Sequence, residues 1–204
     1  MALFSEEIAD GVRRRDPEAI TTVYTALADR LFGYLMARVH NKEIAEDLLE
    51  ATFVELLEKG FTIRGESAVI KSWLFRAAHF NALDHLRRVR RAPEEYREDP
   101  AEFDEPDIRP GPEELAVDAD ISRELFDAIK ELSEDQQEVL LLRYVGELTA
   151  PEVASVVGKK VPAVRGLQHR GERSLARLLD QRSDAMAASA TTGRASQDRD
   201  PVPD

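Results

Sequence analysis

Residues 149–179 read TAPEVASVVGKKVPAVRGLQHRGERSLARLL, a short apolar segment and a longer basic one joined at a glycine. Thr149 and Glu152 form a capping box, and Pro151 occupies the first turn, where its missing N–H costs nothing, so a helix is expected to begin here. Gly158 follows the apolar residues, at the place where a left-handed residue ends a helix. The segment therefore predicts a short helix followed by a tight turn.

The second half of this stretch predicts a longer helix with one apolar and one cationic face. Pro162 suits a first helical turn, and apolar residues recur at helical spacing at Val164, Leu167, Leu175 and Leu178. A short helix bracing a basic helix across a glycine turn is typical of a helix-turn-helix, whose second helix enters the major groove of DNA. The residues expected to contact phosphates are Lys159, Lys160, Arg170, Arg173 and Arg177, and those expected to reach base edges are Arg165, Gln168 and His169.

The alternative interpretation of this stretch is an ordinary basic helix, since charge runs are more often solvated faces than binding sites. Gly166 and Gly171 favour that alternative, because each costs a helix about 1 kcal/mol relative to alanine. The residues of this stretch alone leave both interpretations open.

The composition narrows the class of protein. With 204 residues, 43% of them hydrophobic, the chain suits one domain or two small ones. The absence of cysteine excludes a disulfide framework and a thiolate metal site, and the four histidines form no ligand pair, so we expect no cofactor. The start has no apolar signal segment and no stretch is long enough to cross a bilayer, so we expect a cytoplasmic protein without membrane insertion.

The net charge of −12 at first argues against nucleic acid as a partner, but its distribution reverses that conclusion. Residues 93–120 hold twelve acidic side chains against two arginines, a net charge of −10, and five of the ten prolines. The rest of the chain is therefore near neutral, with its cations gathered at residues 87–91 and 159–177. We interpret residues 93–120 as an extended acidic linker between two domains. We also hypothesise that this linker partly mimics nucleic acid and shields one or the other of the two cationic patches in the free protein.

Helices are expected on both sides of the linker. Before it, residues 5–14 suit a short helix of unassigned role, Asp16 caps a long helix, Asn41 caps an acidic helix that Gly60 ends, and Ser67 caps a third. After the linker, a helical period runs through residues 113–132, and Ser133 with Gln136 forms a capping box for a core helix that includes Tyr144. Residues 181–204 are small and polar and predict a disordered tail.

The helix predicted from Ser67 carries a second candidate surface. Lys71, Trp73, Arg76, Phe80 and Asp84 follow one another at helical spacing and lead into the arginines of residues 87–91. Aromatic rings beside cations suit unstacked bases and their phosphates. A tryptophan at helical spacing is more often a core residue, so the stripe by itself does not decide between a core role and single-strand binding.

Taken together, these segments resemble the bacterial extracytoplasmic-function (ECF) sigma factors, two-domain initiation factors that direct RNA polymerase to promoters. The resemblance covers residues 16–179. It is carried by residues 45–48 (AEDL) with 52–53 (TF), 73–76 (WLFR), 84–88 (DHLRR), 140–144 (LLLRY), 152–154 (EVA) and 164–165 (VR). It implies an all-α fold of two small domains: an N-terminal helical bundle (region 2, residues 16–92) and a C-terminal helix-turn-helix (region 4, residues 121–180), with residues 1–15 preceding them.

The resemblance also implies partners and sites. The partners would be the β′ clamp helices and β flap of core polymerase, promoter DNA and an anti-sigma factor. Polymerase binding would fall to Glu46, Asp47, Leu49, Glu50 and Phe53. Recognition and melting of the −10 element would fall to Arg64, Lys71, Trp73, Arg76, Phe80, Asp84, Arg87, Arg88, Arg90 and Arg91, and the −35 element would be read by the basic helix.

The sequence departs from the usual family pattern at Glu50-Ala51, at Phe80 with Asn81 one place late, at Ser133 where proline is usual, and at the two glycines of the basic helix. Two alternatives remain: a sigma-like decoy that binds polymerase or regulators without initiating, and a plain helix-turn-helix repressor. No nucleophile, base and orienting group can be assembled, so an enzyme is not expected.

Overall fold

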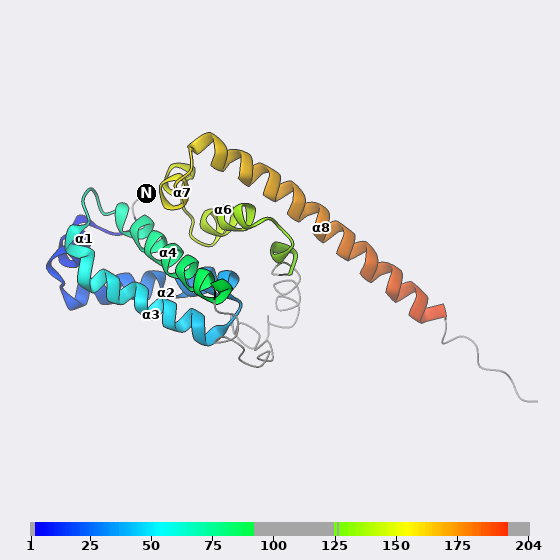
Figure 1. Cartoon of the computed structure of the whole chain (residues 1–204), viewed down its shortest axis with the longest axis horizontal. Helices are drawn as coiled ribbons and strands as arrows, with labels where there is room; N and C mark the ends of the chain where they lie inside the picture. The colour runs from blue at the N-terminus through cyan, green and yellow to red at the C-terminus, as the bar shows by residue number, and fades with distance from the viewer. Residues whose placement is uncertain (1–2, 92–124, 126, 196–204) are drawn as a thin grey trace, which may run out of the picture.

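In the computed structural model, residues 3–91, 125 and 127–195 are described, and all their regular structure is helical (Figure 1). The elements are α1 (Glu6–Arg14), α2 (Pro17–Val39), α3 (Lys42–Lys59), the 3-10 helix η1 (Gly60–Thr62), α4 (Val69–Arg91), α6 (Glu134–Tyr144), α7 (Ala150–Val157) and α8 (Val161–Ala195). The predicted all-α fold of an N-terminal bundle and a C-terminal helix-turn-helix is confirmed.

The helices begin where short polar side chains cap them. Asp16 Oδ1 accepts a hydrogen bond from the amide of Glu18 at 2.8 Å, and Asn41 Oδ1 accepts one from the amide of Ile44 at 3.0 Å. The capping boxes predicted at Ser133 and Thr149 are both present. Each such cap satisfies backbone donors that would otherwise be left without partners, which is why these starts can be predicted from sequence.

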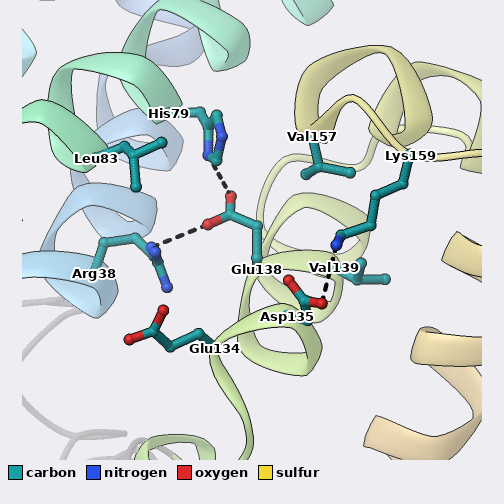
Figure 2. Close-up of a pocket in the computed structure, with 9 residues that line it drawn as sticks. All are labelled: Arg38, His79, Leu83, Glu134, Asp135, Glu138, Val139, Val157 and Lys159. Carbon is teal, nitrogen blue, oxygen red and sulfur yellow. Dashed lines mark hydrogen bonds and ion pairs between the residues drawn. The ribbon is translucent and has the colours of Figure 1, made fainter.

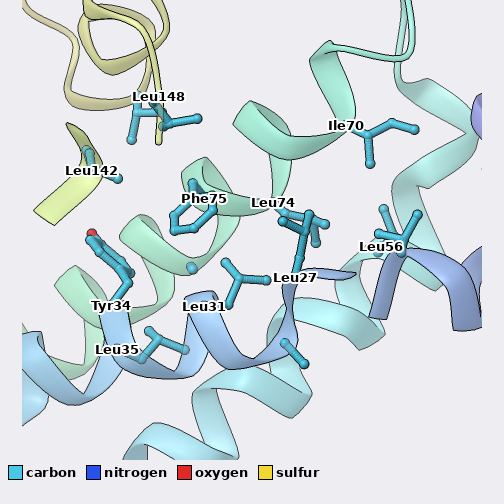
Figure 3. Close-up of a cluster of buried hydrophobic side chains, with 14 of the residues drawn as sticks. Leu27, Leu31, Tyr34, Leu35, Leu56, Ile70, Leu74, Phe75, Leu142 and Leu148 are labelled. Carbon is cyan, nitrogen blue, oxygen red and sulfur yellow. The ribbon is translucent and has the colours of Figure 1, made fainter. Parts of the chain in front are cut away.

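The N-terminal domain, α1 to α4, is built around the apolar face of α2. Leu27, Leu31 and Leu35 are fully buried there and belong to one cluster with the buried Leu56 of α3 and Leu74 of α4 (Figure 3). Burying one such leucine contributes about 1.5–3 kcal/mol, so this face of α2 holds the bundle together.

The C-terminal domain, α6 to α8, forms the helix-turn-helix. Gly158 ends α7 in the left-handed conformation, with φ 66°, as predicted. Gly171 lies where α8 crosses α6, and a Cβ there would be 3.1 Å from Leu140 Cδ1. The helix runs unbroken through Gly166 and Gly171, and at Gly171 the missing side chain allows the two helices to approach closely.

The two domains pack against each other and share one buried cluster. Phe75 of α4, fully buried, meets the ring of Tyr34 edge-on at 5.8 Å between centroids. The fully buried Leu142 and Leu148 of the C-terminal domain join the same cluster, and Figure 3 shows them at the end where Phe75 lies. We call this arrangement, with the domains in contact, the closed form.

Four sequence expectations need comment. Tyr144 was expected in the core but is 60% exposed; it is the last residue of α6, and its hydroxyl donates a hydrogen bond to Glu172 of α8 at 2.5 Å. Helical spacing groups Tyr24 with the buried Val23 and Leu27 on one face of α2, but Tyr24 is 49% exposed. The linker lies outside the described residues, as does most of the helix predicted at 113–132, of which residues 127–130 are helical.

The prediction of a disordered tail from residue 181 is wrong for its first part, because α8 continues to Ala195. The reason is composition: residues 185–190 read AMAASA, and alanine has the best intrinsic helix propensity. Residues 196–204 lie outside the described part. Across the described ranges, no helix combines the length and the apolar content that a bilayer span requires.

Candidate nucleic-acid interface

The cationic face of α8 is displayed as the sequence predicts. Val164 is fully buried beneath it, and this side of the helix packs on α6 and α7. Lys160, Arg165, His169, Arg170, Arg173 and Arg177 are all exposed. A rigid helix that holds its cations outward while its apolar side is anchored can lie along a groove of DNA without refolding.

Gln168 and Lys159 are the members of this set that already have partners. The amide of Gln168 accepts a hydrogen bond from Arg143 Nε at 3.1 Å and donates one to Glu172 Oε1 at 2.8 Å. Lys159 Nζ lies 2.9 Å from Asp135 Oδ2 on α6. DNA would therefore have to compete with these internal contacts, whereas the exposed Arg165 and His169 present their ends directly to solvent.

Glu172 is a functional candidate that sequence reasoning missed. Its carboxylate accepts hydrogen bonds from Tyr144 at 2.5 Å and from Gln168, and these two bonds, in that order, lower its pKa. A carboxylate held ionised on this face repels phosphate and orients Gln168. The i to i+4 spacing of Gln168 and Glu172 was a usable signal, but the part played by Tyr144 was not visible in the sequence.

On α4, the predicted aromatic and basic stripe is partly displayed. Phe80 is 43% exposed, and the guanidinium of Arg76 lies over its ring, 5.6 Å from the centroid. Trp73 is only half-buried and packs against the core, so the core interpretation accounts for part of its surface. Lys71 Nζ donates to the backbone oxygen of Glu147 at 2.7 Å, across to the C-terminal domain.

The remaining candidates for the −10 surface lie at the two ends of α4. At its far end Arg88 and Arg91 are exposed, Arg87 pairs with Asp84 at 3.4 Å, and Arg90 pairs with Glu134 of the C-terminal domain. Before its start, Arg64 is exposed and its Nη1 donates to the backbone oxygen of Phe61 at 2.9 Å. Two of these candidate residues, Lys71 and Arg90, are thus engaged with the C-terminal domain in the closed form.

The acidic face of α3 is exposed to solvent. Glu46, Asp47 and Glu50 are exposed and Leu49 is half-buried. Phe53 does not lie on this surface, because it is buried and packs on Tyr24 with 4.8 Å between ring centroids.

Beside this face lies an apolar patch that was not predicted from the sequence. Val54 and Leu57 of α3 are each 44% exposed, and Tyr24 of α2 is 49% exposed. For α3 this exposure could have been predicted, because Val54 and Leu57 do not share the helical face of the buried Thr52, Phe53 and Leu56. Exposed apolar side chains next to carboxylates suit a protein partner better than DNA.

A buried polar cluster joins the two domains (Figure 2). Glu138 of α6, only 6% exposed, lies 2.9 Å from His79 Nδ1, as Figure 2 shows. It also accepts a hydrogen bond from the hydroxyl of Tyr34 at 2.5 Å. Its other oxygen lies 3.1 Å from Arg38 Nε, an ion pair in which the N–H is not aligned for a hydrogen bond. We call these four residues the Glu138 cluster; they come from α2, α4 and α6, so the cluster exists only while the domains touch.

The ionisation of the Glu138 cluster follows from its burial. Burial raises the pKa of Glu138, but the hydrogen bond with His79 and the charge of Arg38 outweigh that effect, and the net pKa lies below 4.5. Burial, and after it the charge of Glu138, raise the pKa of the Tyr34 phenol well above 10.0. At neutral pH the carboxylate of Glu138 is therefore charged and the phenol of Tyr34 is neutral. In these states the phenol can donate its hydrogen bond and the carboxylate can accept it.

Acidification is expected to weaken the closed form through Glu138. Because its folded pKa is lowered, the stability that it contributes is fully present above pH 4.5 and is lost as the pH falls through the folded value. Urea unfolding measured between pH 7 and pH 3 should show a steeper loss for the wild-type chain than for Glu138→Gln, which cannot ionise. Parallel pH profiles for the two chains would contradict this account.

Two comparisons with known sequences bear on these surfaces. Residues 23–92 match the family Sigma-70 region 2 and residues 122–175 match the family Sigma-70, region 4. The chain is 30% identical to the RNA polymerase sigma factor CarQ of Myxococcus xanthus over 178 residues, which cover 86% of this chain and 95% of CarQ. It is also 30% identical over 173 residues to the ECF RNA polymerase sigma factor BldN of Streptomyces coelicolor, covering 85% of this chain and 65% of BldN.

Solved structures share the fold. The chain is similar to CnrH in complex with the cytosolic domain of CnrY, with a TM-score of 0.63, 19% identity and coverage of 87% of this chain and 97% of that one. It is also similar to the sigma factor RpoE of Bartonella quintana in complex with the anti-sigma factor NepR, with a TM-score of 0.60, 17% identity and coverage of 78% and 96%. At these identities the likeness concerns the fold.

Proposed function

The chain belongs to the extracytoplasmic-function sigma factors of bacterial RNA polymerase, and from that premise we propose that it directs the core enzyme to promoters and opens the DNA there. Region 2, residues 16–92, would bind the polymerase and the −10 element. Region 4, residues 121–180, would read the −35 element. The observation that carries the proposal is the exposed cationic face of α8, anchored on α6 and α7 in helix-turn-helix geometry.

Duplex recognition would rest on the exposed end of α8. Arg165 and His169 would reach base edges, and Lys160 with the arginines that follow would contact phosphates. Lys159 would exchange Asp135 for a phosphate on binding. Such an exchange replaces one charged partner by another, so it adds little affinity and mainly fixes register.

Strand opening would rest on region 2. The exposed ring of Phe80 with Arg76 above it, together with half-buried Trp73, supports stacking of unpaired bases beside their phosphates. The protein would perform no bond chemistry itself: it would position DNA, and the polymerase would catalyse RNA synthesis in the cytoplasm.

Polymerase binding would rest on α3. Glu46, Asp47 and Glu50 offer an exposed acidic face to the β′ clamp helices, and Val54 and Leu57 add exposed apolar area beside it. The β flap would hold region 4. Charge would guide the encounter, and burial of the apolar side chains would add to the affinity.

The closed form supports a resting state for the free factor. It occupies Lys71 and Arg90 with partners in region 4, and it holds the two DNA-reading domains against each other. The similar CnrH and RpoE structures are complexes with CnrY and with the anti-sigma factor NepR. We propose that an anti-sigma partner holds this chain closed, and that polymerase and DNA draw the domains apart.

Replacing Arg165 by alanine is expected to lower affinity for the −35 duplex by about 1–3 kcal/mol and to relax the base preference at one position, because a bidentate base contact is lost. The matched control is Lys160→Ala, which should weaken binding to all sequences alike and reduce the salt dependence by about one counterion. Quantitative binding of the holoenzyme to −35 sequence libraries at several salt concentrations measures both.

Run-off transcription with purified core polymerase tests the whole proposal. The proposed function requires transcripts from at least one promoter of the source genome. A decoy would bind core enzyme without producing transcripts, and a repressor would bind duplex tightly without any polymerase.

A further inference from the structure

The loop that joins α3 to α4, residues 60–67, is held from behind by α1. Arg13 Nε donates to the backbone oxygen of Ile63 at 3.2 Å, and Arg13 Nη2 donates to the backbone oxygen of Gly65. The third nitrogen of the same guanidinium pairs with Asp10 at 2.6 Å. One half-buried side chain from α1 thus fixes two carbonyls that lie 50 and 52 residues further along the chain.

Two further contacts join α1 to the same loop. Glu6 Oε1 accepts a hydrogen bond from the amide of Ser67 at 2.7 Å, and Ser67 is 3% exposed. Val12 packs against Gly60, where a Cβ would lie 3.1 Å from Val12 Cγ1. Both ends of the loop and its middle are therefore tied to one helix.

The opposite side of the loop faces solvent. Phe61 is 48% exposed, and Arg64 and Gly65 are exposed, the latter with φ 105°. The guanidinium of Arg15 lies over the ring of Phe61, 5.3 Å from its centroid. The loop thus has its carbonyls held toward α1 while its aromatic and cationic side chains are displayed.

We propose that Arg13 is a positioning residue for the −10 element: it holds residues 61–66 so that the exposed ring of Phe61 and the cation of Arg64 receive an unstacked base and its phosphate. The inference rests on the proposed function of region 2. Ordering a loop backbone costs conformational entropy, so a loop that is already ordered before binding does not lose that entropy when the base arrives. It also gives a role to the first helix, which the sequence left unassigned.

The experiment uses holoenzyme assembled from the full chain and core polymerase, and fork-junction DNA probes that carry each of the four bases at the unpaired −10 positions. The ratio of affinity between the best and worst base should fall by about tenfold in Arg13→Ala, the factor that corresponds to loss of one charge-assisted hydrogen bond. Affinity for core polymerase and for −35 duplex should not change. Arg13→Lys, which keeps the charge on a single nitrogen, should lose most of the ratio as well.

The matched control is Arg14→Ala, because Arg14 is exposed and makes no hydrogen bond or ion pair with the described residues. Amide hydrogen exchange supplies an independent reading of the loop: residues 61–67 should exchange faster in Arg13→Ala and not in Arg14→Ala. Faster exchange with an intact base ratio would overturn the positioning role, and so would an equal loss of affinity for all four bases.

The two proposals can fail separately. If the wild-type holoenzyme shows no preference among the four bases, the proposed −10 function of region 2 fails, and with it the purpose assigned to Arg13. If the wild type discriminates and Arg13→Ala matches it in both base ratio and exchange, only the positioning role fails.

Discussion

Replacing Glu138 by alanine is expected to destabilise the closed form by about 3–5 kcal/mol, because removal of one partner leaves a buried charge without compensation. Arg38 has a side chain only 8% exposed and lies against Glu138, and the substitution also removes the acceptor of the Tyr34 hydroxyl. If the domains separate, Arg38 becomes hydrated again. We therefore expect the variant to show domain separation before it shows unfolding. Urea unfolding, together with small-angle scattering to detect opening, measures both.

Two control variants define this expectation. Glu134 lies on α6, as Glu138 does, and forms an exposed ion pair with Arg90 of α4. Breaking this pair in Glu134→Ala should cost no more than about 1 kcal/mol. The double variant Arg38→Met with Glu138→Leu removes both charges at once and should recover most of the loss. If Glu138→Ala proves as mild as Glu134→Ala, the Glu138 cluster does not hold the domains together.

Replacing Phe75 by alanine is expected to cost about 3–5 kcal/mol, the range for truncating a fully buried phenylalanine. Its ring meets Tyr34 edge-on, and a Cβ placed on Gly146 would come within 3.2 Å of it, so little space exists around it to collapse. The cavity would open where the two domains meet. Both the stability of region 2 and the population of the closed form should fall, as read by urea unfolding and scattering.

Phe80→Ala supplies a matched comparison, because it makes the same change on the same helix at a side chain 43% exposed. It should cost under about 1 kcal/mol of stability, as is usual for surface substitutions that leave no cavity. It should instead weaken binding to unpaired −10 DNA, by about 1–3 kcal/mol per stacked base. Equal stability losses for the two variants would show that burial at the domain contact is not what makes Phe75 important.

Local signals were sufficient to predict most of the fold. Asp16, Asn41 and Thr149 cap helices through side-chain bonds that span two or three residues, and Gly158 ends one through its own backbone angles. Such features depend on neighbours in sequence, so the sequence alone reveals them. The same holds for the exposed cations of α8, whose spacing relative to Val164 fixes the face on which they lie.

The contact between the domains was not predictable in this way. Glu138 reads as one more exposed carboxylate of an amphipathic helix, and its partners Tyr34, Arg38 and His79 come from two helices more than fifty residues away. The exposure of Tyr24 and Tyr144 was not predicted either. The helical period shows where the apolar stripe of a helix runs, but it does not show which residues lie at the exposed margin of that stripe. The hydrogen bonds from Arg13 to the loop could not be predicted either, because their acceptors are backbone oxygens, which every residue type has.

The Glu138 cluster affects what happens to the surfaces once the domains part. If only leucine and phenylalanine made the contact, each separated domain would expose an apolar patch, which favours self-association or aggregation. Here every parting also returns a guanidinium, a carboxylate, an imidazole and a phenol to water, and their hydration offsets part of the penalty of wetting Phe75, Leu142 and Leu148. The cluster therefore lowers the free-energy cost of the domain separation that the proposed function requires.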